Sequence, residues 1–211
     1  TNRVTTPGHA VPSTRTSIAG AKENERGAVD VLGFSVSGTT ETFVEHVTGS
    51  VLKNYYDSSE SAYKSEFREP VSDVANGRIV IIANASSAVS SVMASHSAGA
   101  LKEDILADLQ LSYTGAWPTD GSSVGGYEPI PMYGETAIGK VGNNISYTLD
   151  LRRMLARIDV KNSAATFSMK HVYLANAYTT GYIAPKWNTT GQIVKPYATT
   201  PNTKTTWHDA A

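Results

Sequence analysis

Hydrophobic and polar positions alternate most clearly in two stretches of the chain, and both predict strands at the centre of a sheet. In "AVDVLGFSVSG" (28–38) both alternating sets of positions carry apolar residues, as expected of a strand that is covered on both faces. "GRIVIIANA" (Gly77–Ala85) places four consecutive β-branched residues after a glycine, the strongest strand signal in the chain.

The rest of the pattern predicts further strands and one helix. "GALKEDILADLQL" (99–111) places Leu101, Ile105 and Leu109 on one stripe, which is typical of an amphipathic helix. Shorter β-type segments lie at 39–54, 144–151 and 166–185. We therefore expect a mainly β fold, a β-sandwich of about seven strands with one short helix and long loops.

One segment, "YTLDLRRMLARIDVKN" (147–162), fits two structures. Its apolar residues at helical spacing are Leu151, Met154, Leu155 and Ile158. As a strand, its apolar alternation changes parity between Arg152 and Arg153, as a β-bulge would produce. Because the flanks are β-type and no cap brackets a helix, the pattern favours a long strand with a slip. Its two apolar runs would serve two parts of the core, with the arginines at the sheet surface.

Composition excludes several classes of function. The chain has 211 residues, 18 basic against 19 acidic, and a formal net charge of -1, so it offers no overall field for nucleic acid. It contains no cysteine, which rules out disulfides and thiolate chemistry. No apolar run approaches the roughly 20 residues of a membrane-spanning helix. A Thr-, Ser- and Gly-rich chain with 18% charged residues is typical of a β-rich surface protein.

The chain carries no motif for catalysis. No two of the five histidines have metal-ligand spacing, and no G-x-S-x-G elbow presents a serine. "GSSVGG" (121–126) lacks the Lys-Ser/Thr that completes a phosphate loop. We therefore expect no enzyme, no cofactor and no metal. An enzyme would become a candidate only if carboxylates and a histidine distant in sequence met in one pocket.

Several stretches, taken in order, resemble the fimbrillins, the pilus subunits of Bacteroidia. They cover residues 1 to about 190. The segments are the connector "TPGHAVPSTRTS", the strand "AVDVLGFSV", "GRIVIIAN" (Gly77–Asn84), "PIPMYGE" (Pro129–Glu135), "RMLARIDV" (Arg153–Val160) and "MKHVYLANAYTTGYI". The resemblance implies a transthyretin-like β-sandwich and a structural function.

The resemblance also implies a domain division. Residues 1–27 would hold a first strand, around 2–6, and an exposed connector. Residues 28–195 would form the β-sandwich, and 196–211 would be a linker toward a C-terminal domain that family members carry. On this basis we expect the chain to be an N-terminal fragment of a longer subunit.

The mechanism that the resemblance implies is assembly by strand exchange. Fimbrillins reach the cell surface as outer-membrane lipoprotein precursors, and an arginine-specific protease then removes the first strand. Removal of the first strand opens a hydrophobic groove. A strand of another fimbrial subunit then fills this groove, because an unpaired edge is a template for a further strand. The cleavage candidates are Arg15, in the Pro/Ser/Thr connector, and then Arg26, beside Gly27; Arg3 lies inside the strand to be removed.

The alternative is a tip-type adhesin domain on the same β-sandwich, with host glycans or proteins as partners. Aromatic side chains in polar segments are able to stack on sugars. The candidates are Tyr55, Tyr56, Tyr63, Trp117 and Tyr127.

Overall fold

The computed structural model describes residues 22–112, 128–155, 162–163, 166, 168–172, 180–185 and 208–209. These residues form twelve strands, two α-helices and one 3-10 turn, η1 (Lys22–Asn24), and all strand pairs are antiparallel. The prediction of a mainly β fold is confirmed. Neither helix of the described part is long and apolar enough to cross a bilayer. The predicted first strand around 2–6 lies outside the described residues.

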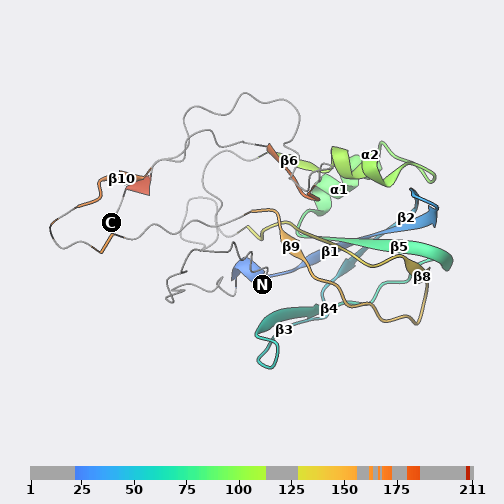
Figure 1. Cartoon of the computed structure of the whole chain (residues 1–211), viewed down its shortest axis with the longest axis horizontal. Coiled ribbons are helices and arrows are strands. Elements are labelled where there is room, and N and C mark those ends of the chain that lie inside the picture. The colour runs from blue at the N-terminus through green and yellow to red at the C-terminus, as the bar shows by residue number, and fades with distance from the viewer. Residues whose placement is uncertain are drawn as a thin grey trace, which may run out of the picture.

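A six-stranded sheet organises the molecule (Figure 1). Its order is β2-β1-β5-β7-β9, and β8 pairs with the first half of β5. The strands are β1 (Ala28–Ser37), β2 (Thr40–Ser50), β5 (Val74–Ala83), β7 (Met132–Glu135), β8 (Gly139–Val141) and β9 (Arg152–Arg153). The sheet is therefore centred on β1 and β5, the two strands that the sequence pattern marks most strongly.

Both faces of β1 and β5 are buried, as the sequence predicts. Even-numbered positions such as Leu32 and Ile82 face one core cluster, and odd-numbered positions such as Val31 and Ile81 face a second. All four side chains are at most 2% exposed. Because successive side chains of a strand point to opposite faces, a strand buried on both sides has no polar alternation.

The two helices cover the first face. The helices α1 (Ser86–Met93) and α2 (Lys102–Asp108) lie together on one side of the sheet (Figure 1). Val89, Ile105 and Leu109 insert into this face and have no exposed surface. The helix predicted at 99–111 is thus confirmed in shorter form. The sequence did not predict α1, since its serine-rich stretch has only one fully buried apolar residue.

Extended segments cover the second face. Tyr147, Leu149 and Leu151 pack against this core, although 145–151 forms no strand, contrary to expectation. Gly134 of β7 makes the crossing possible, since a Cβ there would lie 2.5 Å from the Asp150 carbonyl oxygen. Phe67 and Val71 cover the same face from the chain that leads into β5.

The segment 147–162, whose sequence pattern fits either a helix or a strand, is not helical in its described residues. Arg152 and Arg153 form β9 and pair with Tyr133 and Met132 without a register shift, so the predicted bulge at this pair is wrong. Leu151 packs against the second core and Met154 against the first. Simple alternation therefore carries the apolar residues from one face of the sheet to the other, and both arginines are exposed.

Three two-stranded sheets complete the described part. The hairpin of β3 (Lys53–Asp57) and β4 (Ala62–Glu66) extends away from the helices (Figure 1). The other two sheets pair β6 (Gln110–Ser112) with β11 (Thr180–Tyr182), and β10 (His171–Val172) with β12 (His208–Asp209). None of the residues 53–66 is buried, so the β3–β4 hairpin contributes little to either core.

Candidate functional site

The long edge of the central sheet is β2, which ends the strand order. Its inner side pairs with β1 over the whole length of that strand. On its outer side, the amide of Phe43 donates to Ala100 O at 2.8 Å and Phe43 O accepts from Gly99 N at 2.8 Å. Beyond Phe43, no backbone group of the described residues pairs with this side of β2. Within the described part of the chain, the edge is therefore open from His46 to Ser50.

A bulge decides which amides face outward along this open edge. Phe34 pairs with Phe43 but Gly33 pairs with Glu45, so β2 has one extra residue here. Outward-facing backbone groups change from odd to even positions at this point, because they alternate along an antiparallel strand. Val51 N donates inward to Gly27 O at 3.2 Å, which fits this phase. The outward amides of the open edge belong to His46, Thr48 and Ser50.

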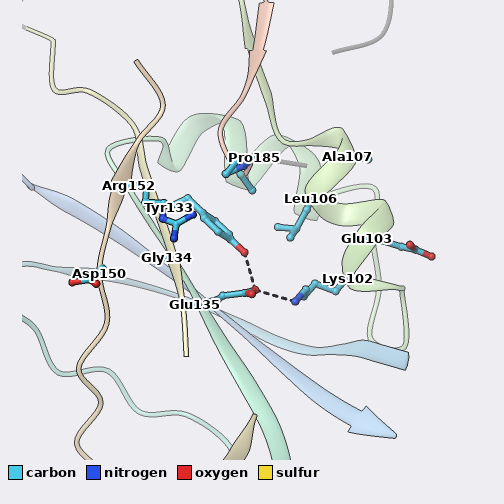
Figure 2. Close-up of a pocket in the computed structure, with 11 residues that line it drawn as sticks. Lys102, Glu103, Leu106, Ala107, Tyr133, Gly134, Glu135, Asp150, Arg152 and Pro185 are labelled. Carbon is cyan, nitrogen blue, oxygen red and sulfur yellow. Dashed lines mark hydrogen bonds and ion pairs between the residues drawn. The ribbon is translucent and has the colours of Figure 1, made fainter. Parts of the chain in front are cut away.

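The opposite edge is short and lies beside a cavity. β9 has two residues and pairs with only half of β7. A cavity of about 460 Å³ separates this edge from α2, a volume typical of small-ligand sites. Its lining comprises Lys102, Glu103, Leu106, Ala107, Tyr133, Gly134, Glu135, Asp150, Arg152, Ala184 and Pro185. Figure 2 shows Lys102, Tyr133 and Glu135 directed toward one another across it.

The charges on this side of the sheet neutralise one another. Lys102 Nζ lies 2.6 Å from Glu41 Oε2. It also lies 2.9 Å from Glu135 Oε2 (Figure 2). Arg78 bridges the same two acids at 3.0 Å each and donates to the Thr136 carbonyl oxygen. Two cations and two acids, drawn from β2, β5, β7 and the first turn of α2, thus join the helix to the sheet. They leave no free charge among themselves for a ligand.

Burial and hydrogen bonds together set the protonation of the two β7 groups in this network, Tyr133 and Glu135. Burial raises the pKa of Tyr133 well above its ordinary value, and the neighbouring Glu135 raises it further. Burial alone would raise the pKa of Glu135, but hydrogen bonds from Lys102 and Tyr133 outweigh it, so that pKa lies below its ordinary value. At neutral pH the Tyr133 hydroxyl therefore donates to a charged Glu135, at 2.8 Å.

A second polar cluster surrounds Asp30, whose side chain has no exposed surface. His46 Nε2 lies 2.8 Å from Asp30 Oδ1, and the Thr48 hydroxyl donates to the same oxygen at 3.2 Å. Ser86, the first residue of α1, donates to Oδ2 at 2.6 Å. Because the carboxyl lies between the serine and the imidazole, the order of a catalytic triad is not met. The cluster instead supplies the buried carboxyl with hydrogen-bond partners.

The predicted processing residues lie in different surroundings. Arg3 and Arg15 lie outside the described residues. Arg26 precedes β1 and is 9% exposed, and its carbonyl oxygen accepts from Asn54 Nδ2 at 3.0 Å. Cleavage after Arg26 in the folded chain would require this segment to open. Both processing sites stay predictions.

The other residues considered from sequence lie apart from one another. His46 contacts the buried Asp30, and His96 contacts the exposed Asp108 at 2.9 Å. No group of three or more acidic or histidine side chains in the described part has the geometry to hold a metal. Tyr55, Tyr56 and Tyr63 lie on the β3–β4 hairpin rather than in a loop. Trp117 and Tyr127 are outside the described residues.

Sequence reasoning missed both polar clusters, although a signal for each was present. Asp30 and Arg78 are the charged residues inside the two most apolar strands. A charged residue at such a position is buried or nearly so, and it needs partners from other strands. The identity of the partners depends on the strand order, which alternation does not give.

Comparison with known proteins identifies no relative of this chain. No protein-family model, no curated protein and no solved structure matches the chain. The interpretation of the open edge therefore depends on the geometry of the chain and on the motifs in its sequence.

Proposed function

We propose that this protein is a structural subunit of a bacterial surface fimbria, and that subunits join by strand addition at the outer edge of β2. The observation that carries the proposal is the open part of that edge, from His46 to Ser50. It belongs to a sheet whose central strands, β1 and β5, are buried on both faces. An unpaired edge of this kind is a template for an extended segment of another chain.

The two edges of the sheet are unequal candidates. The open part of β2 runs from His46 to Ser50, whereas β9 has two residues in all. Main-chain hydrogen bonds supply much of the affinity in strand addition, so the longer open edge offers the stronger joint. The neutralised charges beside β9 favour the same choice, since they hold α2 against the sheet rather than present free groups.

In this proposal an arginine-specific protease removes the first strand and so prepares the subunit for assembly. The fimbrillin-like motifs support this step, as does the difference between the two cleavage candidates. A protease needs an extended, accessible segment, and the side chain of Arg26 is buried. Arg15 is therefore the expected site, with the protein exported to the surface as a lipoprotein precursor.

The proposal is tested by limited digestion with an arginine-specific protease, followed by mass spectrometry and light scattering. We expect early cleavage at Arg15, a resistant core that includes β1 and β5, and growth of polymers from that core. Ser50→Pro removes an outward amide and should reduce polymer growth, whereas Ser58→Pro in the hairpin turn is the matched control. Degradation of the core as fast as the connector, or equal polymer growth in both variants, would contradict the proposal.

A second candidate, a glycan-binding adhesin, is favoured by the surface of the β3–β4 hairpin. Tyr56 and Tyr63 pair across the two strands with ring centroids 5.0 Å apart, and Tyr56 is 49% exposed. Asn54 and Ser65 lie on the same face by alternation. Two aromatic rings beside an amide and a hydroxyl offer stacking together with polar contacts for a sugar.

A glycan array separates the two candidates. The double variant Tyr56→Ser with Tyr63→Ser should abolish any sugar signal of the wild-type chain. Tyr55→Ser is the matched control, because Tyr55 lies on the opposite face of the hairpin, under Lys53 Nζ at 4.6 Å. Absence of a wild-type signal, or a signal that the double variant retains, would count against the adhesin.

A further inference from the structure

Arg26 is a buried cation without a counter-charge in the described part of the chain. Only 9% of the residue is exposed, and its Nε is buried without a hydrogen-bond partner. No carboxylate of the described residues forms an ion pair with its guanidinium. Burial of an unpaired charged donor is costly, so such a group calls for a ligand or a partner.

The fold fixes the backbone around Arg26 at one end of the sheet. Asn84, which follows β5 in a left-handed conformation with φ of 62°, donates from Nδ2 to Glu25 O at 2.7 Å and to Ile130 O at 2.9 Å. Its Oδ1 accepts from Gly27 N at 3.0 Å. One side chain thus ties the residues on both sides of Arg26 to the segment that leads into β7.

The same end of the sheet carries a second arginine. Arg153 of β9 pairs with Met132, two residues beyond Ile130, and Met154 N donates to Pro131 O at 2.8 Å. Burial lowers the pKa of Arg26, and the positive charge of Arg153 lowers it further. The contacts of Asn84 and the pairing of β9 with β7 bring both arginines to this end of the sheet, where their charges repel each other.

We propose that Arg26 and Arg153 together form a binding site for an oxyanion, with the buried guanidinium as its fixed part. The guanidinium group is planar and matches the oxygens of a carboxylate, sulfate or phosphate with paired donors. A bound oxyanion relieves the repulsion between the two cations and gives the buried nitrogen an acceptor. The site is separate from the β2 edge, and it does not depend on the proposed function.

The contrast with Arg78 supports this assignment. Arg78 Nε is likewise buried without a hydrogen bond, but its guanidinium lies 3.0 Å from each of two glutamates and donates to a carbonyl oxygen. Arg26 has the same chemistry and none of these partners among the described residues.

The test is thermal unfolding of the whole chain in sodium sulfate and in sodium chloride at equal ionic strength. Sulfate should raise the melting temperature of the wild type with its concentration, because a ligand that binds the folded state stabilises it. Arg153→Gln should need at least about tenfold more sulfate for the same rise, as expected for a lost charge-assisted contact. Arg152→Gln, which makes the same charge change on the opposite face of β9, should respond like the wild type.

Two further measurements complete the test. Arg26→Lys keeps the positive charge but loses the planar, paired donors of the guanidinium. It should therefore also reduce the rise of the melting temperature in sulfate. Sedimentation of the wild type with and without sulfate distinguishes the sources: release of dimers by sulfate identifies a carboxylate of a second copy, and an unchanged mass identifies a free oxyanion. An equal response of wild type, Arg153→Gln and Arg152→Gln, or no response beyond that to chloride, would overturn the proposal.

Discussion

The strand β5 and the β3–β4 hairpin are built from the same antiparallel pairing, but they differ in what their side chains contact. From Ile79 to Ala83 every residue of β5 is buried, and each face of the strand belongs to a separate core. No residue of the hairpin is buried. A two-stranded hairpin is only marginally stable by itself, so its order depends on local contacts. The central sheet therefore supplies most of the free energy of unfolding, and substitutions in the hairpin should affect that free energy little.

The ion pairs of the hairpin lie at its turn. Lys64 Nζ lies 2.7 Å from Asp57 Oδ2 and 2.8 Å from Glu60 Oε1. The hydrogen bond from Lys64, followed by that from Ser59, lowers the pKa of Asp57, and the hydrogen bond to Asp57 raises the pKa of Lys64. Exposed ion pairs contribute little and weaken in salt. The hairpin should therefore loosen with salt well before the central sheet does.

The largest effect should come from the centre of β5. Ile81→Ala removes a side chain that is 1% exposed, and we expect a loss of about 3 kcal/mol in the free energy of unfolding. Ile138→Ala, which changes an isoleucine that is 47% exposed, is the matched control and should cost far less. Urea unfolding measures both. Equal losses of unfolding free energy in the two variants would contradict the claim that the central sheet, rather than the periphery, stabilises the fold.

A smaller but still large effect is expected at Asp30. Asp30→Asn keeps the shape but replaces one acceptor oxygen by a donor next to groups that already donate, and should cost about 2 kcal/mol. Asp108→Asn is the matched control, since Asp108 also contacts a histidine but is 61% exposed. If both variants unfold at the same urea concentration, the buried cluster does not stabilise the fold.

The ion network on α2 should contribute less. Lys102→Met is expected to cost about 1 kcal/mol at pH 7, against no loss for the exposed Lys140→Met. The pKa of Glu135 is below its ordinary 4.5, so its contribution is present above that pH and is lost as the pH falls further. The difference between Lys102→Met and wild type should therefore narrow below about pH 4.5. If the difference in unfolding free energy between Lys102→Met and wild type stays constant down to pH 3, the charge of Glu135 does not contribute through Lys102.

The smallest effect should occur in the hairpin. Tyr56→Ser removes a ring that is 49% exposed, and it should change the free energy of unfolding by less than about 0.5 kcal/mol. Hydrogen exchange of the Tyr63 amide should nevertheless become faster, because the ring pair is part of what orders the hairpin. A loss in urea unfolding as large as that of Asp30→Asn would show that the hairpin belongs to the core.

Alternation in the sequence was sufficient to predict β1 and β5, because a strand buried on both faces has a continuous apolar pattern. It was insufficient where tertiary contacts decide the structure. The alternating residues 145–151 lie extended over a face of the sheet without pairing, and the parity change at Arg152–Arg153 is a change of face rather than a bulge. The close passage of residues 145–151 over β7 depends on Gly134, whose missing side chain leaves room for the Asp150 backbone.

The candidate sites were harder to predict than the fold. The bulge at Val44, which turns the amides of His46, Thr48 and Ser50 outward, has no marker in the sequence. Arg26 was selected as an accessible arginine beside a glycine, yet its side chain is buried next to a segment more than 100 residues away. Contacts of such sequence separation follow from the strand order alone.

The most direct test of strand addition at β2 is residue-resolved hydrogen exchange of the monomer and of the assembled form. In the monomer, the outward amides of His46, Thr48 and Ser50 should exchange quickly and the inward amides of Val47 and Gly49 slowly. Assembly should protect the three outward amides and leave the inward ones unchanged. Outward amides that still exchange quickly in the polymer would contradict the account.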